Sequence, residues 1–129
     1  MSYILSYGYD FVSDKRIPYM PMHTIGVAVD IPWGAKNSQG TVGSKSGSLL
    51  ISGHFESTRF ANTSNVTKLD PYFLLSVNVN QQIGKNVTVF AVERNLLNVS
   101  YDSVDDYPMP GITVTLGVRF NVELPKEKK

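Results

Sequence analysis

The sequence contains no cysteine, so the chain has neither a disulfide framework nor a thiolate that could bind metal or act as a nucleophile. Charge of either sign is also scarce. Twelve Lys and Arg offset 11 Asp and Glu to a formal net charge of +1, and charged residues make up only 18% of the chain. The one basic cluster is the tail PKEKK. Because nucleic-acid binding needs a basic surface that neutralises phosphates, we expect no nucleic-acid partner.

Long hydrophobic runs are missing as well. No stretch approaches the ~20 apolar residues of a membrane helix, and MSYILSYGYDF lacks the basic start and continuous apolar core of a signal peptide. The spacing of an amphipathic helix does not recur over three turns anywhere. These absences exclude a helical membrane protein. They leave open a transmembrane barrel, whose strands need only ~9–11 residues and are polar at every second position.

Strict alternation of apolar and polar residues is what the sequence does have, in about six places, which is typical of β-strands. We therefore predict an all-β, antiparallel, up-and-down fold in one domain, residues 1–122, followed by a short charged tail, residues 123–129. The Gly/Ser/Asn-rich run at 34–47 is predicted to be a turn or mobile connection. The predicted strands are Ser2–Phe11, His23–Trp33, Ser48–Arg59, two strands within Pro71–Asn95 on either side of the turn GKN, and Gly111–Val122.

The alternation raises the question of whether lipid or a protein core covers the apolar positions. A small soluble barrel usually carries many Lys, Glu and Asp on its outer face, whereas the polar positions here are mainly Ser, Thr, Asn, Gln and Gly. A membrane barrel would also have aromatic residues at its strand ends. The sequence places such residues at Tyr3, Tyr9, Phe11, Trp33, Phe60, Tyr72 and Tyr107. Three interpretations remain open: part of a membrane barrel, a soluble all-β binding domain, and a small barrel assembled from several copies.

Candidate chemical groups are few. His23 and His54 are the only histidines and have no second ligand at metal-binding spacing, so a strand-start role and a barrel-lumen role, respectively, are favoured. Asp102, Asp105 and Asp106 could bind calcium or a cationic ligand, but their loop lacks the glycine and distal glutamate of a calcium loop. No G-x-S-x-G nucleophile motif is present. We predict no enzyme activity, no cofactor and no metal site.

The C-terminal half carries a series of motifs in LDPYFLLSVNVNQQIGKNVTVFAVERNLLNVSYDSVDDYPMPGITVTLGVRF. Their order resembles the C-terminal end of TonB-dependent outer-membrane receptors, in which Y-x-L-L-(D/N), F-x-x-x-x-N-L-x-(D/N)-x-x-Y and Y-P-x-P-G-R precede the last strand. The chain departs from the pattern at Ile112, which replaces the arginine, and it does not stop on an aromatic residue. The matching residues are Tyr72, Leu74, Leu75, Phe90, Asn95, Leu96, Asn98, Tyr101, Tyr107, Pro108, Pro110 and Gly111, with Gly117 and Phe120 in a stretch that looks like the assembly signal of outer-membrane strands, and Tyr19, Pro21 and His23 upstream.

This resemblance implies about six strands of a plugged barrel of about 22 strands in the outer membrane of a Gram-negative bacterium. The family captures a scarce large nutrient, usually a ferric siderophore, haem or cobalamin, and TonB pulls on the plug to drive uptake. Nothing in the sequence resembles the plug or the TonB-binding segment. The implied partners are therefore the missing strands and plug, TonB through that plug, the lipid bilayer and the nutrient. The loops near Ser13–Met22, Ala61–Asp70 and Asn98–Met109 would face the nutrient, and the motif residues would be structural.

Overall fold

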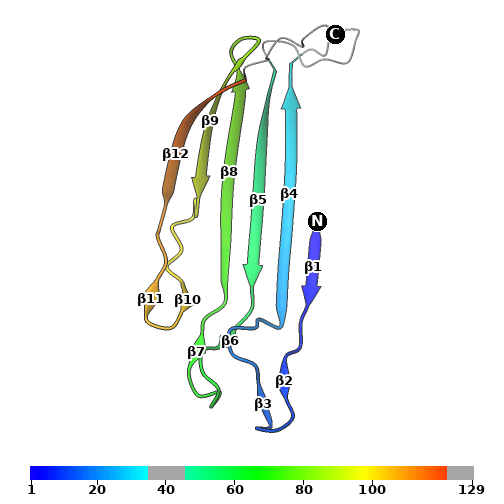
Figure 1. Cartoon of the computed structure of the whole chain (residues 1–129), viewed down its shortest axis with the longest axis vertical. Helices are drawn as coiled ribbons and strands as arrows, with labels where there is room; N and C mark the ends of the chain where they lie inside the picture. The colour runs from blue at the N-terminus through cyan, green and yellow to red at the C-terminus, as the bar shows by residue number, and fades with distance from the viewer. Residues whose placement is uncertain (35–45, 122–129) are drawn as a thin grey trace, which may run out of the picture.

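The computed structural model describes residues 1–34 and 46–121. It confirms the all-β, antiparallel prediction: six strands form one sheet in sequence order, and each strand runs antiparallel to its neighbours (Figure 1). The six strands of this main sheet are β1 (Ser2–Leu5), β4 (His23–Trp33), β5 (Gly47–Glu56), β8 (Tyr72–Gln82), β9 (Val87–Arg94) and β12 (Thr113–Phe120).

Three small hairpins lie together beyond one end of the main sheet (Figure 1). Each hairpin interrupts a long connection between two neighbouring strands of the main sheet, and we call this end the hairpin end. At the opposite end, the turn end, residues 83–86 join β8 to β9, and the amide of Ile83 donates to the carbonyl of Val87 at 2.9 Å. The hairpins are β2 (Tyr9–Asp10) with β3 (Lys15–Arg16), β6 (Arg59–Phe60) with β7 (Lys68–Leu69), and β10 (Asp102–Val104) with β11 (Tyr107–Pro108).

The predicted strand His23–Trp33 is found with the same bounds as β4, but two other predicted strands are too long. The first ends at Leu5 and not at Phe11, because the chain closes against a different neighbour at Gly8, whose carbonyl accepts from the amide of Ile17 at 3.0 Å. The third ends at Glu56 and not at Arg59, which belongs to β6. Apolar and polar residues continue to alternate past both strand ends, so the alternation does not reveal where these two strands end.

The last strand ends at Phe120 rather than Val122, which lies outside the described residues, as do the predicted tail at 123–129 and residues 35–45 of the predicted connection. The division of the chain at residue 122 therefore stays a prediction. The described part of the chain contains no helix with the length and hydropathy needed to cross a membrane.

The main sheet has no hydrophobic core beneath it. Among the described residues, the buried apolar side chains are Ala61, Leu69 and Tyr72, and all three lie in or next to the second hairpin rather than under the middle of the sheet. No large side chain among the described residues is fully buried. The described residues therefore do not enclose the apolar side chains of the main sheet.

Candidate functional site

One face of the main sheet is largely apolar. Side chains of directly paired residues on antiparallel strands lie on the same face, so the strand register identifies the residues of this face. We call it the apolar face. Its members are Tyr3, Leu5, Ile25, Val27, Val29, Ile31, Trp33, Leu49, Ile51, Phe55, Phe73, Leu75, Val77, Val79, Val87, Val89, Ala91, Val114, Leu116, Val118 and Phe120.

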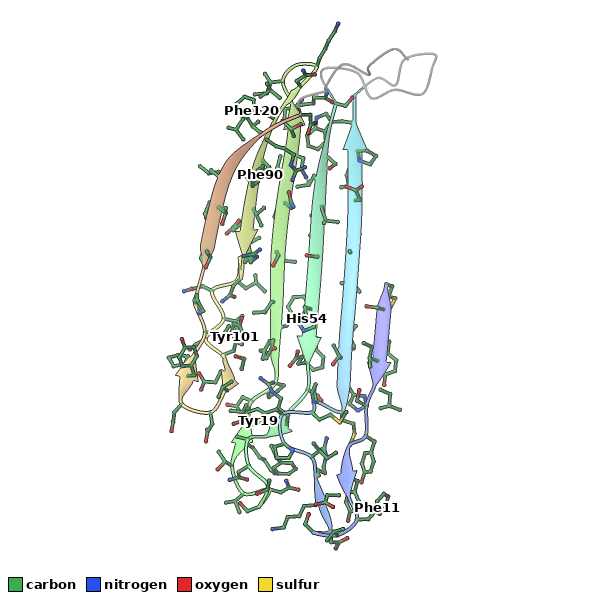
Figure 2. The ribbon with its side chains drawn as sticks, viewed as in Figure 1. Phe11, Tyr19, His54, Phe90, Tyr101 and Phe120 are labelled. Atoms are coloured by element: carbon green, nitrogen blue, oxygen red, sulfur yellow. The ribbon has the colours of Figure 1, made fainter. Side chains whose placement is uncertain are left out.

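The apolar face is aliphatic in its middle and aromatic at its ends. At the hairpin end, Tyr3, Phe55 and Phe73 belong to one row of paired residues that crosses β1, β4, β5 and β8. At the turn end, Trp33 and Phe120 are the last residues of β4 and β12. Figure 2 shows Phe120 at the turn end of its strand. Between these two aromatic ends the face carries Val, Ile, Leu and Ala side chains, apart from Gly47, Gly53, Gln81 and Glu93.

The apolar face is open to its surroundings. Val29, Val114 and Leu116 are 58%, 61% and 75% exposed, respectively, and Phe120 is 71% exposed. A soluble barrel or sandwich requires these residues to pack inward against one another. The described residues supply no such enclosure, so the face is a candidate contact surface rather than half of a core.

The opposite face, which we call the polar face, carries Ser, Thr, Asn and Gln side chains interspersed with the apolar residues Leu50, Leu74, Phe90 and Val92. The side-chain amide of Asn80 donates to Asn78 at 3.0 Å. Next to the hairpin end the polar face carries a cluster that the sequence did not reveal. The carboxylate of Glu56 lies 3.1 Å from His54 Nε2 and 3.3 Å from Arg59. The second guanidinium nitrogen of Arg59 donates to the carbonyl of Asp102 at 2.9 Å.

Arg59 is the most deeply buried residue of this cluster, with only 3% of its side chain exposed. Its guanidinium lies 5.2 Å from the ring centre of Tyr72, and that ring lies 4.4 Å from the ring of Tyr101. The guanidinium nitrogen that faces Glu56 forms an ion pair with the carboxylate and makes no hydrogen bond to the described residues. Arg59, in β6 of the second hairpin, therefore links the third hairpin, through Asp102, to Glu56 at the end of β5.

The first and second hairpins are joined in a similar way. The side-chain amide of Asn65 accepts from the main-chain amide of Arg16 at 2.7 Å and donates to the carbonyl of the same residue at 2.9 Å. The amide of Tyr19 donates to the carbonyl of Phe60 at 2.7 Å. The three loops predicted to face a ligand, 13–22, 61–70 and 98–109, therefore all lie at the hairpin end and are linked through side chains (Figure 2).

The acidic loop residues do not form a metal centre. Asp102 and Asp105 line a polar pocket of about 280 Å³ with Lys68 and Asp70, between the second and third hairpins. Within residues 1–34 and 46–121, no group of three His, Asp or Glu side chains is arranged to hold a metal ion. His23 begins β4, and its ring stacks on Tyr3 and shares a hydrogen bond of 2.9 Å with the phenol oxygen.

The motif residues of the receptor resemblance lie at the hairpin end or in β12, except Phe90, which lies within β9. Asn95 and Leu96 form the turn after β9, and the buried side chain of Asn95 donates to the carbonyls of Val99 and Pro110 at 2.9 and 3.2 Å. The side-chain oxygen of Asn98 (Oδ1) accepts from the main-chain amide of Ile112 at 3.2 Å, beside Gly111. Tyr107 and Pro108 form β11, and Tyr72 begins β8 opposite Tyr101.

The predicted aromatic positions need correction. Tyr9, Phe11, Phe60 and Tyr107 lie in the hairpins, beyond the main sheet, and Figure 2 shows Phe11 at the far tip of the first hairpin. Tyr72 is at a strand end but buried on the polar face, because it pairs with Glu56. Phe55, Phe73 and Phe120 are among the aromatic residues that lie at the ends of the apolar face. The sequence analysis did not include them among the strand-end aromatic residues, because its predicted strand bounds differ from the observed ones.

Comparison with known proteins adds no assignment, since no protein-family model, curated protein or solved structure matches this chain.

Proposed function

We propose that this chain forms part of the wall and outer loops of a TonB-dependent outer-membrane receptor, and that it contributes to active uptake of a scarce nutrient without being competent alone. The observation that carries the proposal is the uncovered apolar face, which is aliphatic in the middle and aromatic at both ends. Transmembrane barrels present such a band to lipid, with aromatic residues at the two membrane–water boundaries.

The lengths of three of the six strands of the main sheet support this proposal. β4, β5 and β8 have 11, 10 and 11 residues. A tilted strand needs ~9–11 residues to cross the hydrocarbon layer, so each of these strands is long enough. The polar face, rich in amide and hydroxyl groups, suits a hydrated lumen packed against a plug.

The edges of the sheet explain why the chain needs further strands. β1 and β12 each have a neighbour on one side only among the described residues. In hydrocarbon an unpaired backbone amide or carbonyl costs several kcal/mol, so both edges require partner strands. We assign these to the missing barrel strands of the same receptor.

The assignment to the TonB-dependent kind rests on the motifs around Tyr72, Asn95, Tyr101 and Gly111 in the sequence. It implies a nutrient such as a ferric siderophore, haem or cobalamin, held by plug and outer loops, and energy supplied by TonB through the plug. The three linked hairpins would then lie on the cell exterior.

A cysteine scan of β4 tests the proposal, because the chain has no cysteine of its own. Each residue from Thr24 to Trp33 is replaced singly by cysteine, labelled with a nitroxide and reconstituted in liposomes. Labels at Val27, Val29 and Ile31 should be accessible to dissolved oxygen, and labels at Ala28 and Asp30 to a water-soluble nickel chelate. The period of two follows from the alternation of strand side chains.

A uniform response along β4, or odd positions shielded from both reagents in a monomer that needs no detergent, would contradict the proposal. That second outcome would favour the soluble all-β binding domain. A defined oligomer in detergent with the same period of two would instead assign the missing edge strands to further copies of the chain.

A further inference from the structure

The apolar face carries a groove of about 460 Å³ near the turn end, over β8, β9 and β12, and we call it the turn-end groove. Its lining consists of two neighbouring rows of paired apolar-face residues and one pair from the polar face. The first row is Val79, Ala91 and Leu116, the second is Gln81, Val89 and Val118, and the polar-face pair is Phe90 and Gly117. The lining is therefore apolar apart from Gln81.

The small side chain of Ala91 explains why the face is hollow here. Ala91 pairs with Val79 on one side and with Leu116 on the other, and its methyl group is the smallest side chain of that row. The side chains on β8 and β12 therefore rise above β9 between them. An aliphatic groove offers dispersion contacts along its length and few hydrogen bonds, so it fits a hydrocarbon chain better than a polar molecule.

Gln81 marks the polar end of the groove. Its side-chain oxygen accepts from the indole nitrogen of Trp33 at 2.9 Å, and its nitrogen donates to the carbonyls of Ser46 and Gln82 at 3.3 and 2.9 Å. The protein thus already engages both polar atoms of Gln81. Tryptophan is enriched at membrane–water boundaries, so this end of the groove lies at the level of lipid headgroups.

The chain around the groove is basic. Residues 79–91 and 114–121 contain two charged residues, Lys85 and Arg119, and both are cationic. Arg119 belongs to the polar face, where its guanidinium lies 5.8 Å from the ring centre of Phe90. Lys85 is exposed in the turn between β8 and β9, beyond Gln81. The flexible stem of a lysine lets its ammonium reach the headgroup level.

We propose that the turn-end groove binds an acyl chain of an anionic phospholipid, whose headgroup lies at Lys85. The proposal rests on the proposed function, because it needs the apolar face to contact lipid. It adds a headgroup preference and a fixed position for one lipid. A zwitterionic phospholipid offers the same acyl chain but gains less from Lys85, because its headgroup carries no net charge.

The test uses the fluorescence of Trp33, which is the only tryptophan of the chain. The full chain is reconstituted in vesicles of equal parts phosphatidylglycerol and phosphatidylcholine, and bromine is attached to the acyl chains of one lipid or of the other. The surface charge is then the same in both vesicles. Bromine quenches tryptophan on contact, and the indole is bonded to Gln81 in the groove wall.

We expect the quenching to correspond to an about fivefold preference for phosphatidylglycerol over phosphatidylcholine, the effect of one lysine near an anionic headgroup. Salt at about 1 M should reduce the preference, because the Debye length falls to ~3 Å.

Two variants separate the charge from the groove. Lys85→Gln removes the cation, and Ala91→Phe fills the groove, so each should abolish the preference. Lys68→Gln is the matched control for charge, since Lys68 lies in β7 at the hairpin end. Val29→Phe is the matched control for size, since Val29 lies on the apolar face of β4 and does not line the groove.

Equal quenching by the two brominated lipids would overturn the groove proposal and leave Trp33 in lipid, so the proposed function would stand. An unchanged preference in both Lys85→Gln and Ala91→Phe would also overturn the groove proposal alone. If neither lipid quenches Trp33, the indole does not contact acyl chains, and both the groove and the lipid-facing sheet are contradicted.

Discussion

At the scale of single residues, three glycines of the main sheet make room for aromatic rings. A Cβ atom on Gly47 would lie 2.6 Å from the ring of Trp33, and one on Gly53 would lie 2.9 Å from Phe73. A Cβ on Gly117 would collide with the ring of Phe90, its direct partner on β9. The rings cover backbone that glycine leaves bare, a device that stabilises glycines within sheets.

We expect Gly117→Val to lower the free energy of unfolding by about 1–3 kcal/mol, because the new side chain must displace the Phe90 ring. Urea unfolding in detergent measures this. Gly84→Ala is the control, since a Cβ there meets nothing within 4 Å. Adding Phe90→Ala to Gly117→Val should recover part of the loss. If the double variant is no more stable than Gly117→Val, the ring is not the cause.

Asn95 has a backbone requirement and a side-chain role. Its φ of 58° is in the left-handed region, which asparagine tolerates, and its side chain also accepts from the amide of Val99 at 2.9 Å. Asn95→Gly keeps the backbone freedom and loses only the hydrogen bonds, whereas Asn95→Ala loses both.

We therefore expect both variants to be less stable than wild type in urea unfolding, with Asn95→Ala lower than Asn95→Gly by about 1 kcal/mol. Equal stability of the two would mean that the backbone conformation contributes nothing at this turn. If Asn95→Gly were as stable as wild type, the three side-chain hydrogen bonds would contribute nothing to stability.

At the scale of elements, the period of two predicted the long strands well and the hairpins poorly. β4 was predicted residue for residue, because eleven alternating residues carry a strong signal. β2, β3, β6 and β7 have two residues each, too few for any period. The bond from Arg59 to Asp102 joins residues 43 positions apart, and alternation carries no information about such contacts.

Arg59 makes the connection between the second and third hairpins testable. Arg59→Ala leaves Glu56 without its buried partner and removes the bonds to the carbonyls of Asp102 and Ser103. We expect a loss of about 2–4 kcal/mol in stability and faster amide exchange over residues 102–107. Arg94→Ala, which removes an exposed arginine at the end of β9, is the control. Unchanged exchange in the third hairpin would show that Arg59 does not hold it.

The turn of the first hairpin should depend on pH. Hydrogen bonds from the Ser13 hydroxyl and the Val12 amide lower the pKa of Asp10 below its ordinary 3.8. A carboxyl with a lowered folded pKa stabilises the turn fully above its ordinary value and loses this contribution as the pH falls through the folded pKa. The Val12 amide shift should therefore titrate below pH 3.8. In Asp10→Asn that titration should disappear; if it persists, another group causes it.

At the scale of the whole molecule, the two faces of the main sheet should respond oppositely to charge. Val29 lies mid-strand on the apolar face, and Ser52 lies on the polar face of the next strand. In lipid, Val29→Lys should cost about 2–4 kcal/mol, because the ammonium would lie in hydrocarbon. Ser52→Lys should cost much less. Urea unfolding of the two variants from liposomes measures both losses of stability. Equal losses would mean that lipid does not cover the apolar face.

The order of the six strands limits what can complete the sheet. Because neighbours alternate in direction and their number is even, β1 and β12 point opposite ways. A closed antiparallel cylinder must keep that alternation all the way round, as bacterial barrels with even strand numbers do. Whatever fills the gap must therefore contribute an even count, so one strand donated by a partner could never seal it, whereas a complete hairpin, or any whole number of hairpins, could.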